Sequence, residues 1–247
     1  MTEPALLSGI IKVILLFIIT YASGCLVYYR GLRVNYTRKI NHFALFFIPM
    51  FLDRLIPAQP NIELLIIGSF FALGSLIIYI KPIRNNSKII ERMFLSFDRP
   101  EDRPNTLLWL STQLAVGYFI IIPVVFIFFS IGYSDLILIP IIVNGIGDGL
   151  AEPIGIKFGK IKYNTYALFS KTKYQRTVEG SLCVFFTSLF VIIVFQSSFS
   201  PTEFLFSLVI FPIVMTLAEA YSPHTWDTPF LFFFGYLTLY IIKTIPF

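Results

Sequence analysis

Residues 144–181 read NGIGDGLAEPIGIKFGKIKYNTYALFSKTKYQRTVEGS, and this polar stretch decides how the rest of the chain is interpreted. It carries three acids, six glycines and six cations, and strongly apolar runs flank it on both sides. A charged, glycine-rich segment between hydrophobic spans must line water or a ligand, because lipid cannot satisfy its polar groups. The stretch is therefore the first candidate for a functional site.

The composition is that of a membrane protein. Of 247 residues, 56% are hydrophobic and 13% are charged, whereas soluble domains carry about 25% charged residues. The apolar runs are continuous and about as long as a spanning helix, whereas a membrane β-barrel would show short segments of alternating hydrophobicity. The sequence predicts an all-α, polytopic helical membrane protein.

Eight apolar segments predict about 7–8 transmembrane helices in a single integral-membrane domain over residues 1–247. The segments are residues 6–29, 43–56, 62–80, 107–131, 136–146, 181–199, 203–221 and 229–245. The second is short and is expected to be broken by Pro49. The fifth is also short and is expected to continue through residues 148–156 as a broken helix. Short or interrupted hydrophobic segments point to binding sites inside membrane proteins.

Basic residues alternate from loop to loop along the chain. The loops after the first, third and fifth apolar segments carry four, six and six of the 19 Lys and Arg residues. The positive-inside rule places these loops in the cytoplasm and both termini on the opposite side. The net charge of +5 is thus explained by membrane topology, and nucleic-acid binding is not expected.

Two carboxylates in the central stretch are spaced for a metal ion. Asp148 and Glu152 are four residues apart and share one face of a helical turn. Paired carboxylates suit Mg²⁺, especially when substrate phosphates complete its shell. Gly145, Gly147 and Gly149 permit positive φ angles and close approach of the backbone to a ligand. The alternative interpretation is an ordinary Asp-Gly turn followed by a basic cytoplasmic loop.

Cations lie on both sides of this motif in the sequence. Lys171, Lys173 and Arg176 follow it at intervals that suit phosphate charge. Arg38 and His42, with Lys39 between them, share a helical face ahead of the second apolar segment. These three residues are expected either to reach phosphate oxygens or to act as interfacial anchors whose side chains extend to the membrane surface.

Two further acids lie near the end of the seventh apolar segment. Glu219 is inside that segment, where an acid is costly and suggests a function. Asp227 follows in a short connection and is also a candidate helix N-cap, because Pro229 suits a first helical turn. By the loop count, both acids share a membrane side with Asp148. The convergence predicts a cytoplasm-facing site for a phosphorylated, water-soluble substrate, with a second substrate entering from the bilayer.

Four motifs occur in order between residues 38 and 229. They are R-K-x-x-H, G-D-x-x-A followed by G-x-x-x-G, a basic residue before E-G-S, and a late acid with a following Asp. The residues that match are Arg38, Lys39, His42, Gly147, Asp148, Ala151, Gly155, Gly159, Arg176, Glu179, Gly180, Ser181, Glu219 and Asp227. In this order the motifs resemble the family of phytol kinases, dolichol kinases and CTP-dependent diacylglycerol kinases, which is related to the phosphatidate cytidylyltransferases. The chain departs from the family pattern at Thr177-Val178, where Lys-Ser is usual, and at Thr228, where Asn is usual.

The resemblance implies transfer of the γ-phosphate of CTP to the hydroxyl of a lipid alcohol, namely phytol, farnesol, a polyprenol such as dolichol, or diacylglycerol. It implies Mg²⁺ as cofactor, held by Asp148 with Glu152. The implied catalytic residues are Asp148, Glu179, Glu219 and Asp227. The implied nucleotide- and phosphate-binding residues are Arg38, Lys39, His42, Gly147, Gly155, Gly159, Lys171, Lys173, Arg176 and Ser181. The expected partners are CTP, a lipid alcohol and the membrane, and a homodimer is compatible with this prediction.

Two other functions stay open at this point. A CTP:lipid-phosphate cytidylyltransferase would share the metal motif, but its usual C-terminal glycine-rich motif with paired aspartates is not found in the sequence, which favours the kinase. A membrane transporter would use the interrupted fifth segment as its binding site. A transporter would need no constellation for a metal and a nucleotide.

Overall fold

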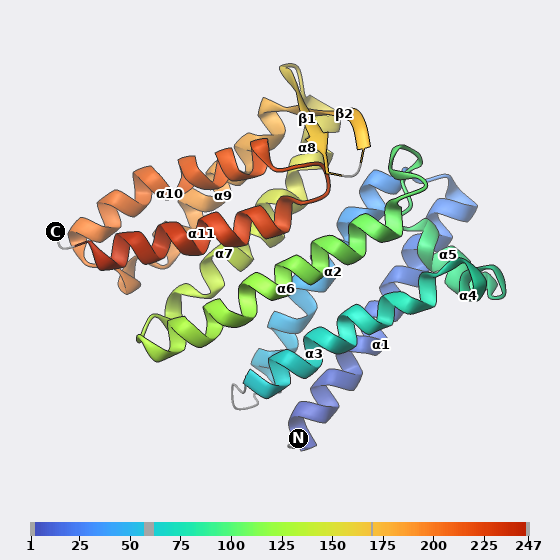
Figure 1. Ribbon diagram of the computed structural model, residues 1–247, viewed down its shortest axis with the longest axis horizontal. Helices are drawn as coiled ribbons and strands as arrows, with labels where there is room; N and C mark the ends of the chain where they lie inside the picture. Colours follow the sequence, from blue (N-terminus) through green and yellow to red (C-terminus); the bar gives the residue numbers. More distant parts are fainter. Residues whose placement is uncertain (1–2, 57–61, 169, 246–247) are drawn as a thin grey trace. The chain divides into compact units, whose positions relative to one another are not determined.

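A computed structural model describes residues 3–56, 62–168 and 170–245 of the chain (Figure 1). The structure is predominantly helical, as predicted, and it contains one two-stranded hairpin that the sequence analysis did not predict. The chain divides into two compact units, Met1–Ser111 and Thr112–Phe247. The prediction of a single domain over residues 1–247 stays a prediction.

Among the described residues, four helical stretches are long and apolar enough to cross a membrane. They are Pro4–Arg30, Thr106–Ser130, Ser134–Phe158 and Pro201–Tyr221. Glu63–Tyr79 and Val178–Val194 are apolar but shorter. These helices support the predicted membrane class, but they do not confirm a count of 7–8 spans. The side of the membrane that each loop faces stays a prediction.

The first unit is built on its N-terminal helix. Its elements are α1 (Glu3–Arg30), α2 (Val34–Leu55), α3 (Ile62–Ser75), η1 (Leu76–Tyr79), α4 (Lys81–Asn85), α5 (Lys88–Leu95) and η2 (Pro100–Asp102). α1 packs on α2 and α5. Tyr79, Met93 and Phe94 form a small buried core. α2 runs through Pro49 without ending, so the predicted break of the second apolar segment at Pro49 is wrong.

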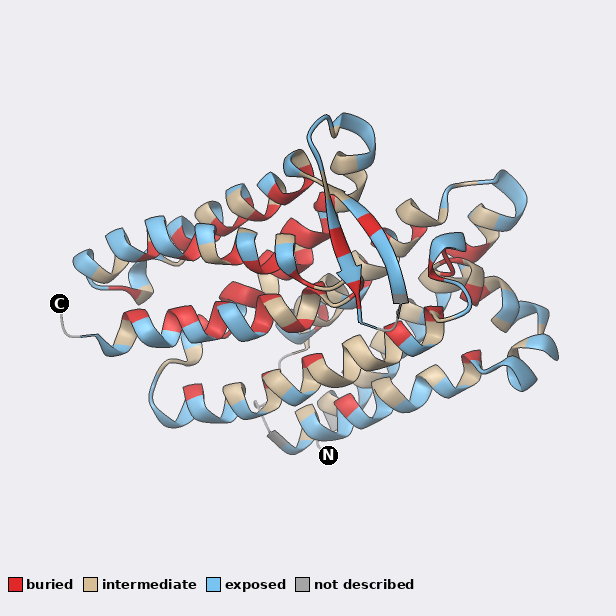
Figure 2. Ribbon diagram, turned by 45° about the horizontal axis from the view of Figure 1, so that its top comes forward, coloured by how far each residue is buried: buried red, intermediate tan, exposed pale blue. Residues whose placement is uncertain are grey.

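The second unit is a bundle of apolar helices topped by the hairpin. Its elements are α6 (Thr106–Ser130, which starts in the first unit), η3 (Ser134–Leu136), α7 (Leu138–Val143), η4 (Asn144–Asp148), α8 (Gly149–Phe158), β1 (Lys162–Ala167), β2 (Ser170–Thr177), α9 (Val178–Val194), η5 (Gln196–Ser198), α10 (Pro201–Tyr221) and α11 (Asp227–Thr244). α9 packs on α8 and α10, and α10 packs on α11. Val184, Phe211 and Leu231 are fully buried in this core, and Figure 2 shows the buried positions along these helices.

The glycine-acid motif lies in continuous helix. α7, η4 and α8 follow one another from Leu138 to Phe158, so the predicted continuation of the fifth segment through residues 148–156 is confirmed, but the predicted break in that helix is wrong. η4 is a turn of π-helix, which carries one extra residue per turn and is frequent at functional sites. Gly145, Gly147 and Gly149 have negative φ angles, so neither the Asp-Gly turn nor a positive φ occurs at this motif.

Many of the charged residues of the stretch 144–181 lie in the hairpin. β1 pairs antiparallel with β2, so that Tyr163 lies opposite Arg176 and Tyr166 opposite Lys173. Residues of β1 alternate between exposed and buried or partly buried positions, as expected for a strand with one covered face. The side chain of Thr177 then accepts a hydrogen bond from the Gly180 backbone N–H and begins α9. The sequence analysis treated this segment as a basic loop because lysines hide the alternation of its Tyr and Thr residues.

Candidate functional site

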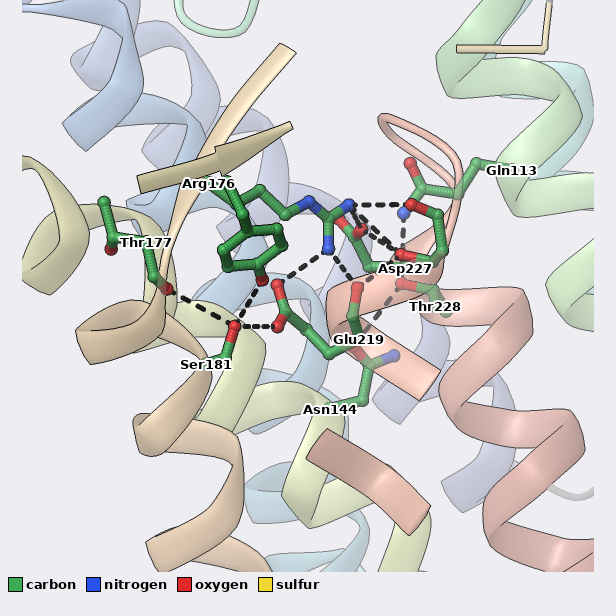
Figure 3. A network of polar contacts seen from close by, with 10 residues as sticks. Gln113, Asn144, Arg176, Thr177, Ser181, Glu219, Asp227 and Thr228 are labelled. Atoms are coloured by element: carbon green, nitrogen blue, oxygen red, sulfur yellow. Dashed lines mark hydrogen bonds and ion pairs between the residues drawn. The ribbon is translucent and has the colours of Figure 1, made fainter. Parts of the chain in front are cut away.

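The side chain of Arg176 is the centre of a buried polar cluster in the second unit (Figure 3). Its Nη1 donates to Glu219 Oε1 at 2.8 Å and also to the Glu219 carbonyl oxygen. Its Nη2 donates to Ser222 Oγ at 3.1 Å and forms an ion pair with Asp227 Oδ1. One guanidinium on β2 therefore ties the C-terminal end of α10 to the first turn of α11. We call Arg176, Glu219, Ser222 and Asp227 the Arg176 cluster.

A hydrogen-bonded chain continues from this cluster to the start of α9 and to β1. Ser181 Oγ donates to Glu219 Oε2 at 2.7 Å. The hydroxyl of Tyr163 lies 2.6 Å from Ser181 Oγ. Burial raises the pKa of Tyr163 to about 12, and the negative charge of Glu219 acts in the same direction. The Tyr163 phenol is therefore neutral at physiological pH and is able to donate a hydrogen bond to Ser181 Oγ, whose own proton goes to Glu219.

The electrostatics of the cluster keep Arg176 charged. Burial opposes that charge, but the carboxylates of Asp227 and Glu219 more than offset burial and raise the pKa of the guanidinium above its ordinary value. Only 13% of the Arg176 side chain is exposed. An arginine in this position is suited to its task, because its planar fork of N–H groups binds two carboxylates at once. The cluster therefore acts as a rigid charged support at the ends of two apolar helices.

Asp148 lies on η4 near this cluster and is buried. Its negative charge acts on Glu219, so carboxylates from three separate elements share one region of the second unit. Glu152 follows one turn later on α8 and is partly exposed. Among the described residues, no three His, Cys, Asp or Glu side chains form a group that would hold a metal ion. The pair still fits Mg²⁺, which binds proteins through one or two carboxylates and completes its shell with water and phosphate oxygens.

A second set of hydrogen bonds connects α6 with the first turn of α11, next to Asp227. Gln113 Nε2 donates to Thr228 Oγ1 at 3.0 Å, and Thr228 Oγ1 lies 3.5 Å from Asn144 Oδ1 (Figure 3). Sequence reasoning missed these three residues, and it also missed Tyr163 and Ser222. Gln113 did carry a signal, because a polar side chain inside an apolar span suggests a function.

The motif glycines face neighbouring elements of the same unit. A Cβ on Gly147 would lie 3.0 Å from the Val184 Cα, and one on Gly155 would lie 2.7 Å from Thr177 Oγ1. A Cβ on Gly159 would also meet the Thr177 side chain. A Cβ on Gly180 would lie 2.7 Å from the Ala151 carbonyl oxygen. These positions bring η4 and α8 close to α9 and Thr177. This is a packing reason for Gly147, Gly155 and Gly159, which the sequence analysis assigned to phosphate binding.

Glu179 holds the connection between α8 and β1. Its carboxylate accepts hydrogen bonds from the backbone N–H groups of Lys160 at 2.9 Å and Ile161 at 3.3 Å. Backbone hydrogen bonds, first its own and then that of Lys160, lower the pKa of this exposed carboxyl. Glu179 is therefore ionised at neutral pH, and these contacts fix the chain where the hairpin leaves α8.

The first cationic motif lies on α2 of the first unit. Lys39 is buried, and the His42 ring lies 4.8 Å from the Phe46 ring. Thr37 Oγ1 donates to the Ser96 carbonyl oxygen at 2.7 Å and anchors the same helix. The Arg176 cluster is built by residues of the second unit alone, and a role for Arg38, Lys39 and His42 in phosphate binding stays a prediction.

Three other predicted residues have a definite placement in the second unit. Lys171 and Lys173 are exposed on β2, and strand alternation places them on the face opposite Tyr174 and Arg176. Asp227 is the first residue of α11 and Trp226 precedes the helix, without a side-chain cap. Asp227 is thus not the N-cap, and it contacts Arg176 and Ser222 instead.

No family model matches the chain, and no curated protein or solved structure matches it either. The resemblance to the phytol and dolichol kinase family therefore rests on the motifs alone. What the structure adds is that three of them come together: Arg176 and Ser181 of the third motif contact Glu219, and Asp148 of the second acts on it electrostatically.

Proposed function

We propose that the chain is a CTP-dependent kinase of a lipid alcohol. The observation that carries the proposal is that Arg176 binds the Glu219 and Asp227 carboxylates at the ends of apolar helices, while the charge of Asp148 acts on Glu219. Buried acids at that depth are costly and mark sites of function. A site there is able to receive a water-soluble nucleotide from one side and a membrane lipid from the other.

On the nucleotide side, Asp148 with Glu152 would hold Mg²⁺ together with the triphosphate. The ion would supply charge neutralisation for the transferred phosphoryl group. Phosphoryl transfer otherwise depends on positioning and electrostatics more than on covalent chemistry by the protein. The support that the Arg176 cluster provides for these helix ends suits such a task.

On the lipid side, the alcohol oxygen attacks the γ-phosphorus, the bond between the γ-phosphorus and its bridging oxygen breaks, and CDP leaves. The hydroxyl proton must pass to a base. Glu219 has one carboxylate oxygen bound by Arg176 and the other by Ser181. Asp227 is bound by Arg176 and Ser222, so both acids are held in place and both are candidates to take the proton.

An apolar groove between α6 and α11 offers a place for the hydrocarbon chain of the alcohol. It has a volume of about 260 Å³ and is lined by Val116, Ile120, Trp226, Pro229, Phe230, Phe233 and Phe234. Gln113 lies one turn before Val116 on α6, and Thr228 directly precedes Pro229. The groove therefore ends beside the Gln113–Thr228 hydrogen bond and Asp227. Its volume is below the roughly 300–1,000 Å³ of typical ligand pockets, which suits one hydrocarbon chain.

The proposal is tested with CTP labelled separately at its α- or γ-phosphate. The purified protein is incubated with Mg²⁺ and a panel of prenols, diacylglycerol and phosphatidate. We expect γ-label in the lipid phase with an alcohol, and a loss on the order of 100-fold in Asp148→Asn, a size typical of losing one electrostatic contact to the transition state. The exposed acid Asp135 supplies the matched control, Asp135→Asn, which should retain full activity.

The other outcomes of that assay are equally decisive. Transfer of α-label to phosphatidate would identify a cytidylyltransferase and refute the kinase. Absence of lipid label from either position, combined with solute uptake by proteoliposomes, would favour a transporter. A folded Asp148→Asn protein with full activity would refute the metal assignment.

The groove is tested by filling it. Ile120→Trp should raise the KM for a long-chain alcohol several-fold and leave the KM for a short-chain alcohol unchanged. Only the long chain extends into the part of the groove that the tryptophan would fill. The control is Phe119→Trp, since Phe119 directly precedes Ile120 on α6 but is 80% exposed and does not line the groove. Equal effects of the two variants, or equal effects on both alcohols, would contradict this placement of the lipid chain.

A further inference from the structure

The outward face of the hairpin has a composition that the Arg176 cluster does not explain. Strand alternation turns Tyr163, Thr165, Tyr174 and Arg176 toward the rest of the second unit. The residues of the opposite face are all exposed: Lys162, Asn164, Tyr166, Lys171, Lys173 and Gln175. Tyr166 and Lys173 are paired across the strands, and the Lys173 ammonium lies 5.5 Å from the centre of the Tyr166 ring.

The charge on this face has a single sign. Between residues 157 and 177 the sequence contains six cations and no Asp or Glu. The one arginine among them is bound in the Arg176 cluster, and the five lysines are exposed. A face of this kind attracts anions and repels other basic surfaces.

Exposed apolar side chains accompany the lysines. Phe158 and Ile161 flank the start of β1, while Tyr166 and Leu168 lie toward the tip of the hairpin, and all four are at least half exposed, Tyr166 at 64%. Lys and aromatic residues gather in this way at the interface between water and lipid, where long side chains extend their charge to the headgroups. A site for a small soluble anion would not need this apolar rim.

The hairpin also connects two apolar helices, α8 and α9. α8 ends at Phe158, which is the last residue of the candidate span Ser134–Phe158. β2 leads directly into α9, which is an apolar helix. The hairpin therefore begins and ends at the level where apolar segments meet water, next to the headgroups of a leaflet.

We infer that the outward face of the hairpin docks on the anionic headgroups of that leaflet. Lys162, Lys171 and Lys173 contact lipid phosphates, while Tyr166 and Leu168 reach the boundary between headgroups and acyl chains. The contact is electrostatic and local, so salt weakens it. Arg176 lies on the opposite face of the same strand, so a docked hairpin holds the strand that supports the Arg176 cluster.

The test places a probe at the tip of the hairpin. The full chain, with Cys25→Ser and Cys183→Ser, carries Leu168→Cys labelled with an environment-sensitive fluorophore, in nanodiscs of phosphatidylcholine with or without phosphatidylglycerol. We expect a blue shift of the emission only with phosphatidylglycerol and its loss at high salt. Lys171→Gln with Lys173→Gln should abolish the shift. The charge-matched control is Lys81→Gln with Lys88→Gln, two exposed lysines of the first unit, which should retain it.

Hydrogen exchange of the amides of residues 162–177 in the unlabelled protein provides a second readout. We expect slower exchange with phosphatidylglycerol than without it. No lipid-dependent change in either readout would overturn the inference, as would an equal response to inorganic phosphate or CTP in phosphatidylcholine discs, which would indicate a site for soluble anions. An equal loss in the control variant would show that net charge acts without the hairpin. No measurement here involves turnover, so the result is independent of the proposed kinase activity.

Discussion

Replacing Arg176 by Gln is expected to destabilise the second unit by about 3–5 kcal/mol, the usual cost of breaking a buried ion pair. The variant leaves the Glu219 and Asp227 carboxylates buried without the guanidinium that joins them. Glutamine is too short and carries no charge to replace it. The measurement is the thermal unfolding midpoint of the purified protein in detergent, together with transfer of γ-label from CTP, which we expect to be lost.

Arg176→Lys should be almost as damaging. A single ammonium on a flexible stem does not reproduce the planar fork that contacts Glu219, Ser222 and Asp227 together. The matched control is Lys173→Gln, which removes one positive charge from the same strand but from its exposed face. An unfolding midpoint for Arg176→Gln equal to that of Lys173→Gln would show that the Arg176 cluster contributes no stability.

A combined variant separates stability from chemistry. Arg176→Met with Glu219→Gln and Asp227→Asn removes all three charges at once, and neutral replacement of a buried ionic network is often tolerated. Ser181 and Ser222 stay available as hydrogen-bond partners for the new amides. We expect most of the stability to return while phosphoryl transfer stays absent, because no carboxylate is left at Glu219 or Asp227 to take the proton. Recovery of activity in this variant would exclude these acids from catalysis.

The sequence predicted the helical membrane class and three of the four residues of the Arg176 cluster, but it did not predict which residues contact one another. Asp148 was found by its spacing to Glu152, and Glu219 because an acid inside an apolar span is costly. The count of basic loops placed both of them and Asp227 on one side of the membrane. Arg176 was assigned to phosphate, but its nearest anions are carboxylates of the protein itself. Sequence alone does not distinguish these cases, because a guanidinium binds carboxylate and phosphate with the same geometry.

The hydrophobic pattern of the sequence predicted neither the hairpin nor the close packing at the glycines. β1 and β2 alternate, but their covered positions carry Tyr163, Thr165 and Arg176, where an apolar-polar pattern requires apolar side chains. The glycines of this motif suggested positive φ angles or a turn. For Gly147 and Gly155 the cause is instead a neighbour distant in sequence, because α9 and Thr177 lie so close that a Cβ would be crowded. Such tertiary contacts override local preference.

Gly180→Ala is the second substitution expected to destabilise the protein strongly. Its effect comes from a steric clash and not from the loss of a charge. The new Cβ would lie 2.7 Å from the Ala151 carbonyl oxygen and 3.1 Å from Thr177 Oγ1. The carbonyl belongs to the backbone of α8, so relief requires movement of a helix and not of a flexible side-chain end. Overpacking of this kind costs about 1–3 kcal/mol. We expect a lower unfolding midpoint and reduced activity, because α8 follows directly after Asp148 and α9 carries Ser181.

Gly68→Ala is the matched control for this prediction, since Gly68 is inside α3 and a Cβ there meets no atom within 4 Å. Alanine favours a helix over glycine by about 0.5–1 kcal/mol, so the control should unfold at the same temperature or slightly higher. The two variants add the same methyl group to a helix, and only the space around it differs. If Gly180→Ala were as stable as Gly68→Ala, α8 and α9 would not be in close contact, and Asp148 would have no fixed position relative to Ser181 and Glu219. The proposed site depends on that contact, so this comparison tests the geometry of the site without any assumption about its substrate.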